Sequence, residues 1–306
     1  MRAVLVVNPQ ATSTTPGGRD VLAHALASEV KLEVVETTHR GHAAEIAEAA
    51  RQEGVELVVA HGGDGTVNEV VNGILGAECA LQHGTAPMLG VVPGGSANVF
   101  ARALGLPPDP VEATHLLLEA IIEQRTRQVG LGMADGRWFT FTAGMGWDAD
   151  VVAGVHKHRA KEAATALYVR TAFTSYVHPP LGRPPLTIDV PGEKPVVVRT
   201  AFVSNTDPWT YLGRWPLRLN PGCSFDTGLG LFALTKLGLV TVLSQLVQAM
   251  SGFESRRGSH LVHHNDVPTL RIRSEKPVNF QVDGDLVGER TSVEFVSAPN
   301  ALTVVV

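Results

Sequence analysis

The sequence has few of the features that mark secreted, membrane-spanning or nucleic-acid-binding proteins. It contains 2 cysteines in 306 residues, Cys79 and Cys223, and they form no Cys-x-x-Cys pair. Two isolated cysteines cannot staple a small secreted scaffold, so we expect a reducing, cytoplasmic location. The net charge of -5 gives no basic surplus for neutralising a phosphate backbone. We therefore expect no nucleic acid partner.

Long apolar runs are also missing. The longest, 237–250, is interrupted by Ser244, Gln245 and Gln248 and falls short of a bilayer-spanning helix. The N-terminal run 3–7 is too short for the apolar core of a signal peptide. We expect no transmembrane segment and no secretory leader.

The composition instead favours a chain with one large core or two moderate ones, since 44% of the residues are hydrophobic and 18% are charged. The first third alternates β-branched runs with alanine-rich helical stretches, which is typical of a doubly wound, mainly parallel α/β sheet. Strand-like segments separated by Gly and Pro follow from about residue 130. We predict an α/β domain over 1–130 and a β-rich domain over 131–297, with a further strand at the C-terminus that could join either sheet. Within the second domain, 237–250 has a helical period, for which we favour core packing.

The most informative motif is a glycine-rich loop, 62–66, placed directly after the strand expected at 57–60 and before a helical stretch. A glycine turn into a helix offers unobstructed backbone N–H groups to phosphate oxygens at the carboxyl edge of an α/β sheet. The alternative is a tight turn in which Asp64 or Thr66 caps the next helix. Two more expected strands also end in loops of this kind, at Asn8-Pro9 and at 93–98. Three such loops favour a nucleotide site.

No Walker-type P-loop is present, and no lysine stands in or beside the glycine loops, so a metal ion must supply most of the charge neutralisation. The segment 144–149 formally fits the Gly-x-Gly-x-x-Gly/Ala dinucleotide motif. It lacks the acidic residue expected about 20 positions later. We interpret it as a turn that lines the site.

Phosphoryl transfer to an alcohol also needs a carboxylate that accepts the hydroxyl proton. Asp283-Gly284-Asp285 follows the strand expected at 280–282, which would place Asp283 at a strand end facing an interdomain cleft. The alternative is an ordinary hairpin turn, because Asp-Gly is a strong hairpin signal.

Together these residues resemble the diacylglycerol kinase catalytic family, which includes sphingosine and ceramide kinases and bacterial lipid kinases. The matching segments are Asn8-Pro9, 62–69, 93–98, Gly146 with Asp148, and 283–285. The resemblance implies a Rossmann-like nucleotide domain, a C-terminal β-sandwich, ATP in the cleft between them, and a last strand, 298–306, that returns to the first domain.

The resemblance also implies roles for individual residues. It assigns the catalytic base to Asp283 and a role in Mg²⁺ binding to Asp226. A later acid of the Asp226 segment is replaced by Gly230, Ser96 stands where threonine is commoner, and Asp285 stands where glutamate is usual. The residues expected to bind ATP are Asn8, Thr38, Gly62, Gly63, Asp64, Gly65, Thr66, Asn68, Glu69, Gly94, Ser96, Asn98 and Asp285.

The function expected from these residues is transfer of the γ-phosphate of ATP, with Mg²⁺, to a lipid hydroxyl, with diacylglycerol as the first candidate. The basic and aromatic segment 155–170 could lie against an anionic bilayer at the inner membrane face, or form a solvated helix surface. A homodimer stays open. The alternatives are an NAD kinase or another kinase of a water-soluble substrate, and a catalytically weak protein that binds nucleotide or lipid.

Overall fold

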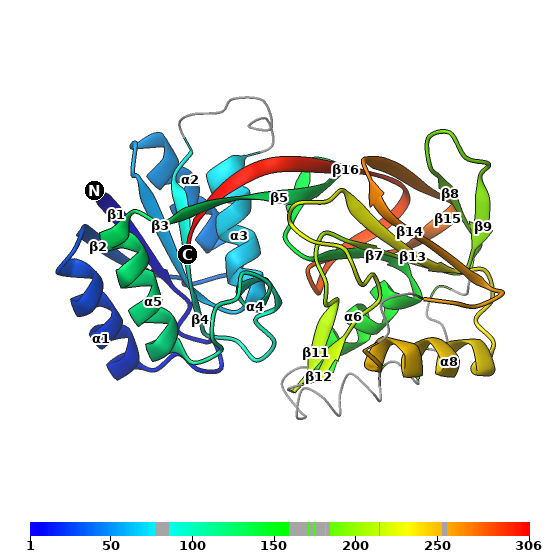
Figure 1. Ribbon diagram of the computed structural model, residues 1–306, viewed down its shortest axis with the longest axis horizontal. Coiled ribbons are helices and arrows are strands. Elements are labelled where there is room, and N and C mark those ends of the chain that lie inside the picture. The colour runs from blue at the N-terminus through cyan, green and yellow to red at the C-terminus, as the bar shows by residue number, and fades with distance from the viewer. Residues whose placement is uncertain are drawn as a thin grey trace. The chain divides into compact units, whose positions relative to one another are not determined.

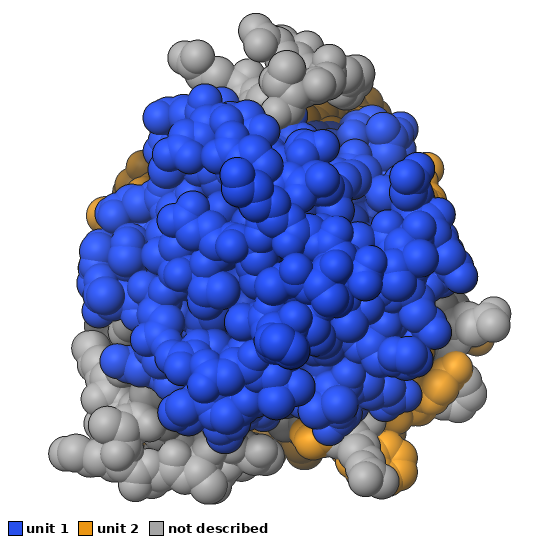
Figure 2. Space-filling view, turned by 90° about the vertical axis from the view of Figure 1, so that its left-hand side faces the viewer, with its two compact units in different colours: residues 1–131, 136–138, 298–306 blue, residues 132–135, 139–297 orange. Residues whose placement is uncertain are grey.

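The computed structural model describes residues 1–76, 86–158, 171, 174–175, 181, 184–213, 215–252 and 256–306. The chain forms two compact units, coloured separately in Figure 2. Unit 1 contains residues 1–131, 136–138 and 298–306, and unit 2 contains residues 132–135 and 139–297. Cys79 and the part of the basic segment at 159–170 lie outside the described residues.

Unit 1 is built on a parallel sheet with the strand order β4, β3, β1, β2. Helices α2 and α3 pack together on one face, and α1 and α5 pack together on the other (Figure 1). The elements of this unit are β1 (Arg2–Val7), α1 (Pro16–Ala27), β2 (Lys31–Glu36), α2 (His42–Gln52), β3 (Leu57–Gly62), α3 (Asp64–Leu75), β4 (Met88–Pro93), α4 (Val99–Ala103) and α5 (Pro110–Glu123).

The central strands of unit 1 are buried on both faces. Every residue of β3 is buried, as are residues 3–7 of β1, and this is why these strands are apolar throughout. Leu5 and Leu57 belong to the core cluster that includes Leu22 of α1 and Leu117 of α5. The doubly wound arrangement expected from the sequence is confirmed. Its strand order reverses between β1 and β3, the place where α/β sheets bind ligands.

Unit 2 is a mainly antiparallel β structure. Strand β15 pairs with β8 through residues 271–274 and with β7 through residues 280–282. It therefore belongs to two groups of strands, and side chains from both groups form one core. The elements are β7 (Thr142–Gly146), α6 (Trp147–His158), β8 (Leu186–Asp189), β9 (Val196–Val198), β10 (Thr200–Ser204), β11 (Thr210–Leu212), β12 (Trp215–Leu217), β13 (Leu229–Leu234), α8 (Leu239–Met250), β14 (Leu261–Val267) and β15 (Thr269–Val282).

Three further strands have residues in both units, namely β5 (Thr126–Ala134), β6 (Arg137–Phe139) and β16 (Asp285–Val305). Strand β16 pairs with β15 from Asp285 to Val296. Near its end Val304 lies opposite Leu89 of β4 in a parallel pair. The terminal residues of the chain therefore belong to the sheet of unit 1.

Helix α8 differs from the expectation of core packing. Its helical period is as expected, but its large apolar side chains face outward, with Val240 83% and Val247 67% exposed. The side chains turned inward are Gln245 and Ala249, and Val242 is partly buried against the same core cluster as Ala249. Core packing was thus the wrong interpretation for its apolar face. No helix among the described residues has both the length and the apolar character needed to cross a bilayer.

Unit 2 also buries two acids in the first turn of α6. Asp148 accepts a hydrogen bond of 2.7 Å from Nε2 of Gln281, and Asp150 accepts one of 2.7 Å from Nδ2 of Asn279. A Cβ atom on Gly144 would lie 2.1 Å from Oδ2 of Asp148, so the glycine leaves room for this carboxyl. Burial raises the pKa of Asp148 to about 7, and the neighbouring charge of Asp150 adds to the rise.

We expect Asp148→Asn to stabilise the fold more at pH 8 than at pH 5. The pKa of Asp148 is near 7 in the folded chain and about 3.9 when unfolded, so its contribution to stability is complete below pH 4 and is lost as pH rises through 7. Asparagine keeps an oxygen for Gln281 and cannot ionise. The gain at pH 8 should be on the order of 1–4 kcal/mol.

Urea unfolding at both pH values measures this difference. Asp20→Asn, an exposed acid on α1, is the matched control and should leave the pH dependence unchanged. An equal effect of Asp148→Asn at pH 5 and pH 8 would contradict the interpretation.

Candidate functional site

Three loops meet at the carboxyl edge of the parallel sheet in unit 1. In the strand register, Val7 lies opposite His61, and Gly62 lies opposite Pro93. Asn8 after β1, the loop into α3 after β3, and residues 94–98 after β4 therefore start at the same level. The structure brings these predicted segments together at the point where the strand order reverses.

The loops after β3 and β4 touch through their backbones. The N–H of Gly94 donates to the carbonyl of Gly62 at 2.7 Å. A Cβ atom on Gly95 would lie 2.7 Å from Cα of Gly63, and one on Gly94 would lie 3.0 Å from Cα of Gly62. Only glycine allows this approach, so the composition of both loops follows from their contact.

Asn98 fixes the shape of the second loop. Its Oδ1 accepts from the N–H of Gly95 at 2.9 Å, and its Nδ2 donates to the carbonyl of Gly95 at 2.7 Å. Its backbone has a φ of 46°, in the left-handed region that asparagine tolerates better than most residues. Ser96 lies between Gly95 and Asn98 in the sequence and is exposed.

The N-terminus of α3 opens at these loops. Gly63 is the N-cap and makes no side-chain cap to the first-turn N–H groups. The helix dipole and these N–H groups favour an anion. Asp64 turns one carboxylate oxygen to the N–H of Phe100 at 3.2 Å, and Oγ1 of Thr66 accepts from Nδ2 of Asn8 at 3.0 Å. The N-cap position of α3 belongs to Gly63, so neither Asp64 nor Thr66 is the N-cap residue that the alternative expected.

Glu69 and Thr38 organise the loop between β2 and α2. The Glu69 carboxylate accepts from the N–H groups of Gly41 at 2.9 Å and Ala43 at 3.3 Å. The N–H of Thr38 donates to Nδ1 of His42 at 3.1 Å. Glu69 thus holds the start of α2, and its position here favours a supporting role over phosphate contact.

Asn68 points away from the loops and is buried. Its Nδ2 donates to the carbonyl of Trp138 at 2.9 Å, and its Oδ1 accepts from Arg137 at 3.2 Å. It therefore anchors the short segment 136–138 to unit 1.

Two residues at this edge were not predicted. His61 lies buried under the loops, with Nδ1 3.2 Å from the carbonyl of Val92 and Nε2 3.3 Å from Oγ1 of Thr14. Burial lowers the pKa of His61, which keeps the ring neutral beneath the helix N-terminus. The position of His61 directly before the glycines was a usable signal, whereas nothing in the sequence around Thr14 marked it.

In unit 2 the carboxylate of Asp283 is buried and surrounded by donors. Oδ2 accepts from N and Oγ1 of Thr140 at 2.7 and 2.8 Å, and Oδ1 accepts from the N–H groups of Phe141 and Thr142 at 3.0 Å each. Burial raises the pKa of Asp283, and these donors oppose the rise. Four donors match the acceptor capacity of a carboxylate.

Asp283 and Gly284 form the turn between β15 and β16. Both have positive φ values, 48° and 78°, as a two-residue type I′ hairpin requires. Asp285 lies opposite Val282 in the strand pair and is partly exposed. The hairpin expected as the alternative is therefore present, and it presents one buried and one partly exposed carboxylate.

The segment around Asp226 does not form a metal centre. Asp226 is exposed on a turn, and its N–H donates to Oγ of Ser224 at 3.3 Å. A Cβ atom on Gly230 would lie 2.8 Å from Cβ of Asn220, so this glycine is required by packing. Within the described parts of the chain, no three His, Cys, Asp or Glu side chains lie close enough together to hold a metal ion. These residues do not fit a resident Mg²⁺.

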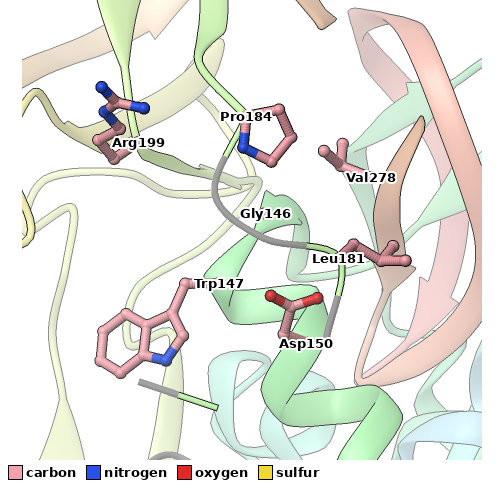
Figure 3. Close-up of a pocket in the computed structure, with 7 residues that line it drawn as sticks. All are labelled: Gly146, Trp147, Asp150, Leu181, Pro184, Arg199 and Val278. Carbon is pink, nitrogen blue, oxygen red and sulfur yellow. The ribbon is translucent and has the colours of Figure 1, made fainter. Parts of the chain in front are cut away.

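A pocket in unit 2 lies beside the buried acids of α6. Trp147 and Asp150 project from the first turn of α6, and Val278 projects from β15 (Figure 3). The cavity volume is about 10 Å³, enough for about one water molecule. This pocket therefore holds no nucleotide. The segment 144–149 forms the end of β7 and the start of α6, so its dinucleotide-like pattern has a packing origin.

The chain was compared with known proteins. Residues 2–134 match the model of the diacylglycerol kinase catalytic domain. A protein from Chromohalobacter salexigens that is named "Probable lipid kinase YegS-like" is 35% identical over 147 residues, 48% of this chain and 44% of that protein. Diacylglycerol kinase from Bacillus subtilis is 37% identical over 110 residues, 36% of this chain and 33% of that protein. The chain thus spans less than half the length of these relatives.

Similarity of fold extends further than similarity of sequence. The crystal structure of a diacylglycerol kinase from Bacillus anthracis superposes with a TM-score of 0.73, covers 99% of this chain and 96% of its own, and is 21% identical. At that identity the match establishes the fold. The sequence match that includes all three loops of unit 1 shows that residues 2–134 are similar to the diacylglycerol kinase catalytic domain.

Proposed function

We propose that this protein transfers the γ-phosphate of ATP to a lipid hydroxyl, with diacylglycerol as acceptor and phosphatidic acid as product. The observation that carries the proposal is the backbone contact between the two glycine loops beside the N-terminus of α3. Bare backbone and helix N–H groups at the reversal of strand order suit a polyphosphate. The names of the relatives support a lipid as the acceptor.

The residues that would hold ATP are those of the three loops. Gly62–Thr66 and Gly94–Asn98 would take the phosphates through backbone N–H groups, while Asn8 holds Thr66 in place. None of these residues is cationic. Mg²⁺ brought with the nucleotide would supply the missing positive charge.

The acidic hairpin is the source of the proton acceptor in this proposal. As the lipid oxygen forms its bond to the γ-phosphorus, the bond to the bridging oxygen of ADP breaks and the hydroxyl proton moves to a carboxylate. The sequence assigned this role to Asp283. Its four donors favour a positioning role for Asp283 and leave the partly exposed Asp285 as the better acceptor.

Catalysis would take place at a membrane surface, because the acceptor is a bilayer lipid. We propose the cytoplasmic face, where ATP is available. The homodimer that the sequence leaves open stays a prediction.

The direct test is phosphate transfer from labelled ATP with Mg²⁺ to lipids in mixed micelles, with NAD and water as separate acceptors. We expect labelled phosphatidic acid in the tube that contains diacylglycerol, and none after chelation of Mg²⁺. Label found in NAD alone would favour the NAD kinase alternative. Binding of ATP without transfer to any acceptor would favour the catalytically weak protein.

Substitutions in the hairpin should separate the two carboxylates. We expect Asp285→Asn to lower kcat by roughly 100-fold or more, with ATP affinity and melting temperature unchanged, because it removes a proton acceptor. Asp285→Glu keeps the carboxylate and should retain most activity. Asp283→Asn should lower the melting temperature as well as kcat, because one amide cannot satisfy four donors.

Steady-state kinetics and thermal unfolding of the three variants show which of the two carboxylates accepts the proton. If Asp283→Asn keeps the wild-type melting temperature and loses transfer while Asp285→Asn stays active, then Asp283 itself is the base.

A further inference from the structure

We infer that helix α8 docks this protein on an anionic lipid surface. The docking surface is the α8 face, defined as Leu239, Val240, Leu243, Leu246, Val247 and Met250. These positions share one side of the helix at 100° per residue, and the six side chains are 43–83% exposed. Exposed apolar patches of this kind mark interaction sites.

The outward orientation of the α8 face is fixed by contacts on the opposite side of the helix. Nε2 of Gln245 donates to the carbonyl of Arg257 at 2.9 Å, and the carbonyl of Ala249 accepts from the N–H of Arg218 at 2.9 Å. Ala249 is part of a core cluster with Phe232. Rotating the apolar side inward would break these bonds, so the exposure is built into the packing of unit 2.

Among the described residues, the charged side chains that flank α8 in sequence are basic, and Glu254 lies outside the described residues. Residues 237–252 contain no charged side chain. Exposed cations flank them, with Lys236 before the helix and Arg257 after it. Arg218, whose backbone bonds the end of α8, is 44% exposed, while its partner Asp207 is 5% exposed. An apolar face with a basic rim is complementary to a bilayer that carries negative headgroups.

An exposed aromatic side chain lies on the element next to α8. Strand β12 packs against α8, and its Trp215 is 68% exposed. Tryptophan favours the boundary between headgroups and acyl chains. The exposed tryptophan therefore supports the interpretation that the α8 face contacts a membrane and not water.

A second copy of the chain is a weaker candidate for the partner. A two-fold dimer on this face would place the same patch against itself and bring the basic rims together. An anionic lipid surface can bury the apolar side chains among its acyl chains and attract the cations with its headgroups.

This inference goes beyond the proposed function and depends on it only for the choice of a lipid as the partner. The test is sedimentation with vesicles that contain 30% phosphatidylglycerol in phosphatidylcholine, and with pure phosphatidylcholine vesicles, in the absence of ATP. Leu243→Glu is the test variant. Ser244→Glu is its matched control, because the same charge enters the next position, on the polar side of the same helix.

We expect wild type to bind the anionic vesicles. Leu243→Glu should weaken this binding by about tenfold or more, because the burial of the leucine is lost and the added negative charge is repelled by the anionic headgroups. Ser244→Glu should have a much smaller effect. Lys236→Gln should weaken binding to anionic vesicles by roughly fivefold and leave binding to neutral vesicles unchanged. All three variants should keep wild-type kcat on a short-chain, water-soluble diacylglycerol.

Equal weakening by Leu243→Glu and Ser244→Glu, or no binding by wild type, would overturn the inference. So would a concentration-dependent dimer that Leu243→Glu abolishes, which would assign the face to a second copy. Vesicle binding without phosphate transfer would sink the proposed function and leave this inference standing, while transfer without vesicle binding would do the reverse.

Discussion

The candidate site depends on one close approach, that between the backbones of Gly62-Gly63 and Gly94-Gly95. Because a Cβ atom at Gly95 would lie 2.7 Å from Cα of Gly63, neither loop can move or gain a side chain independently of the other. The contact keeps the ends of β3 and β4 level and leaves the N-terminus of α3 uncovered by side chains. Asn8 and Asp64 each use the side chain to tie one loop or helix start to another, and Asn98 fixes the shape of its own loop. The chemistry of the candidate site is therefore backbone chemistry supported by polar side chains.

Unit 2 uses carboxylates in a different way. Asp148, Asp150 and Asp283 are all buried, and each is bonded to donors from a strand or turn distant in sequence. Such buried acids are costly unless their hydrogen bonds are made, so they specify how β7, α6 and β15 meet. The pKa of Asp148 near 7 makes this part of the fold sensitive to pH in the range where a cell operates.

The sequence predicted the parts of the molecule that follow from local pattern. Alternating strands and helices gave the doubly wound unit, and glycines directly after expected strands located the loops. The sequence pattern did not predict contacts between residues distant in the chain. Nothing near Asp283 indicates that Thr140 to Thr142 supply its hydrogen-bond donors, and nothing near Asn68 indicates its bond to Trp138. Periodicity also identified α8 as a helix but could not say which side faces the core. The inward side is set by Gln245 through its bond to Arg257, a polar contact that an apolar pattern hides.

The most direct test of the account is calorimetric titration of ATP with Mg²⁺ into wild type, Gly95→Ala and Gly17→Ala. Gly95→Ala adds one methyl group at the loop contact, whereas a Cβ atom on Gly17, in α1, meets nothing within 4 Å. We predict that Gly95→Ala weakens ATP binding by about tenfold or more while the melting temperature shows the chain still folded, because displaced N–H groups no longer converge on the phosphates. Gly17→Ala should bind as wild type does. Wild-type affinity in Gly95→Ala would contradict the claim that this contact forms the phosphate site.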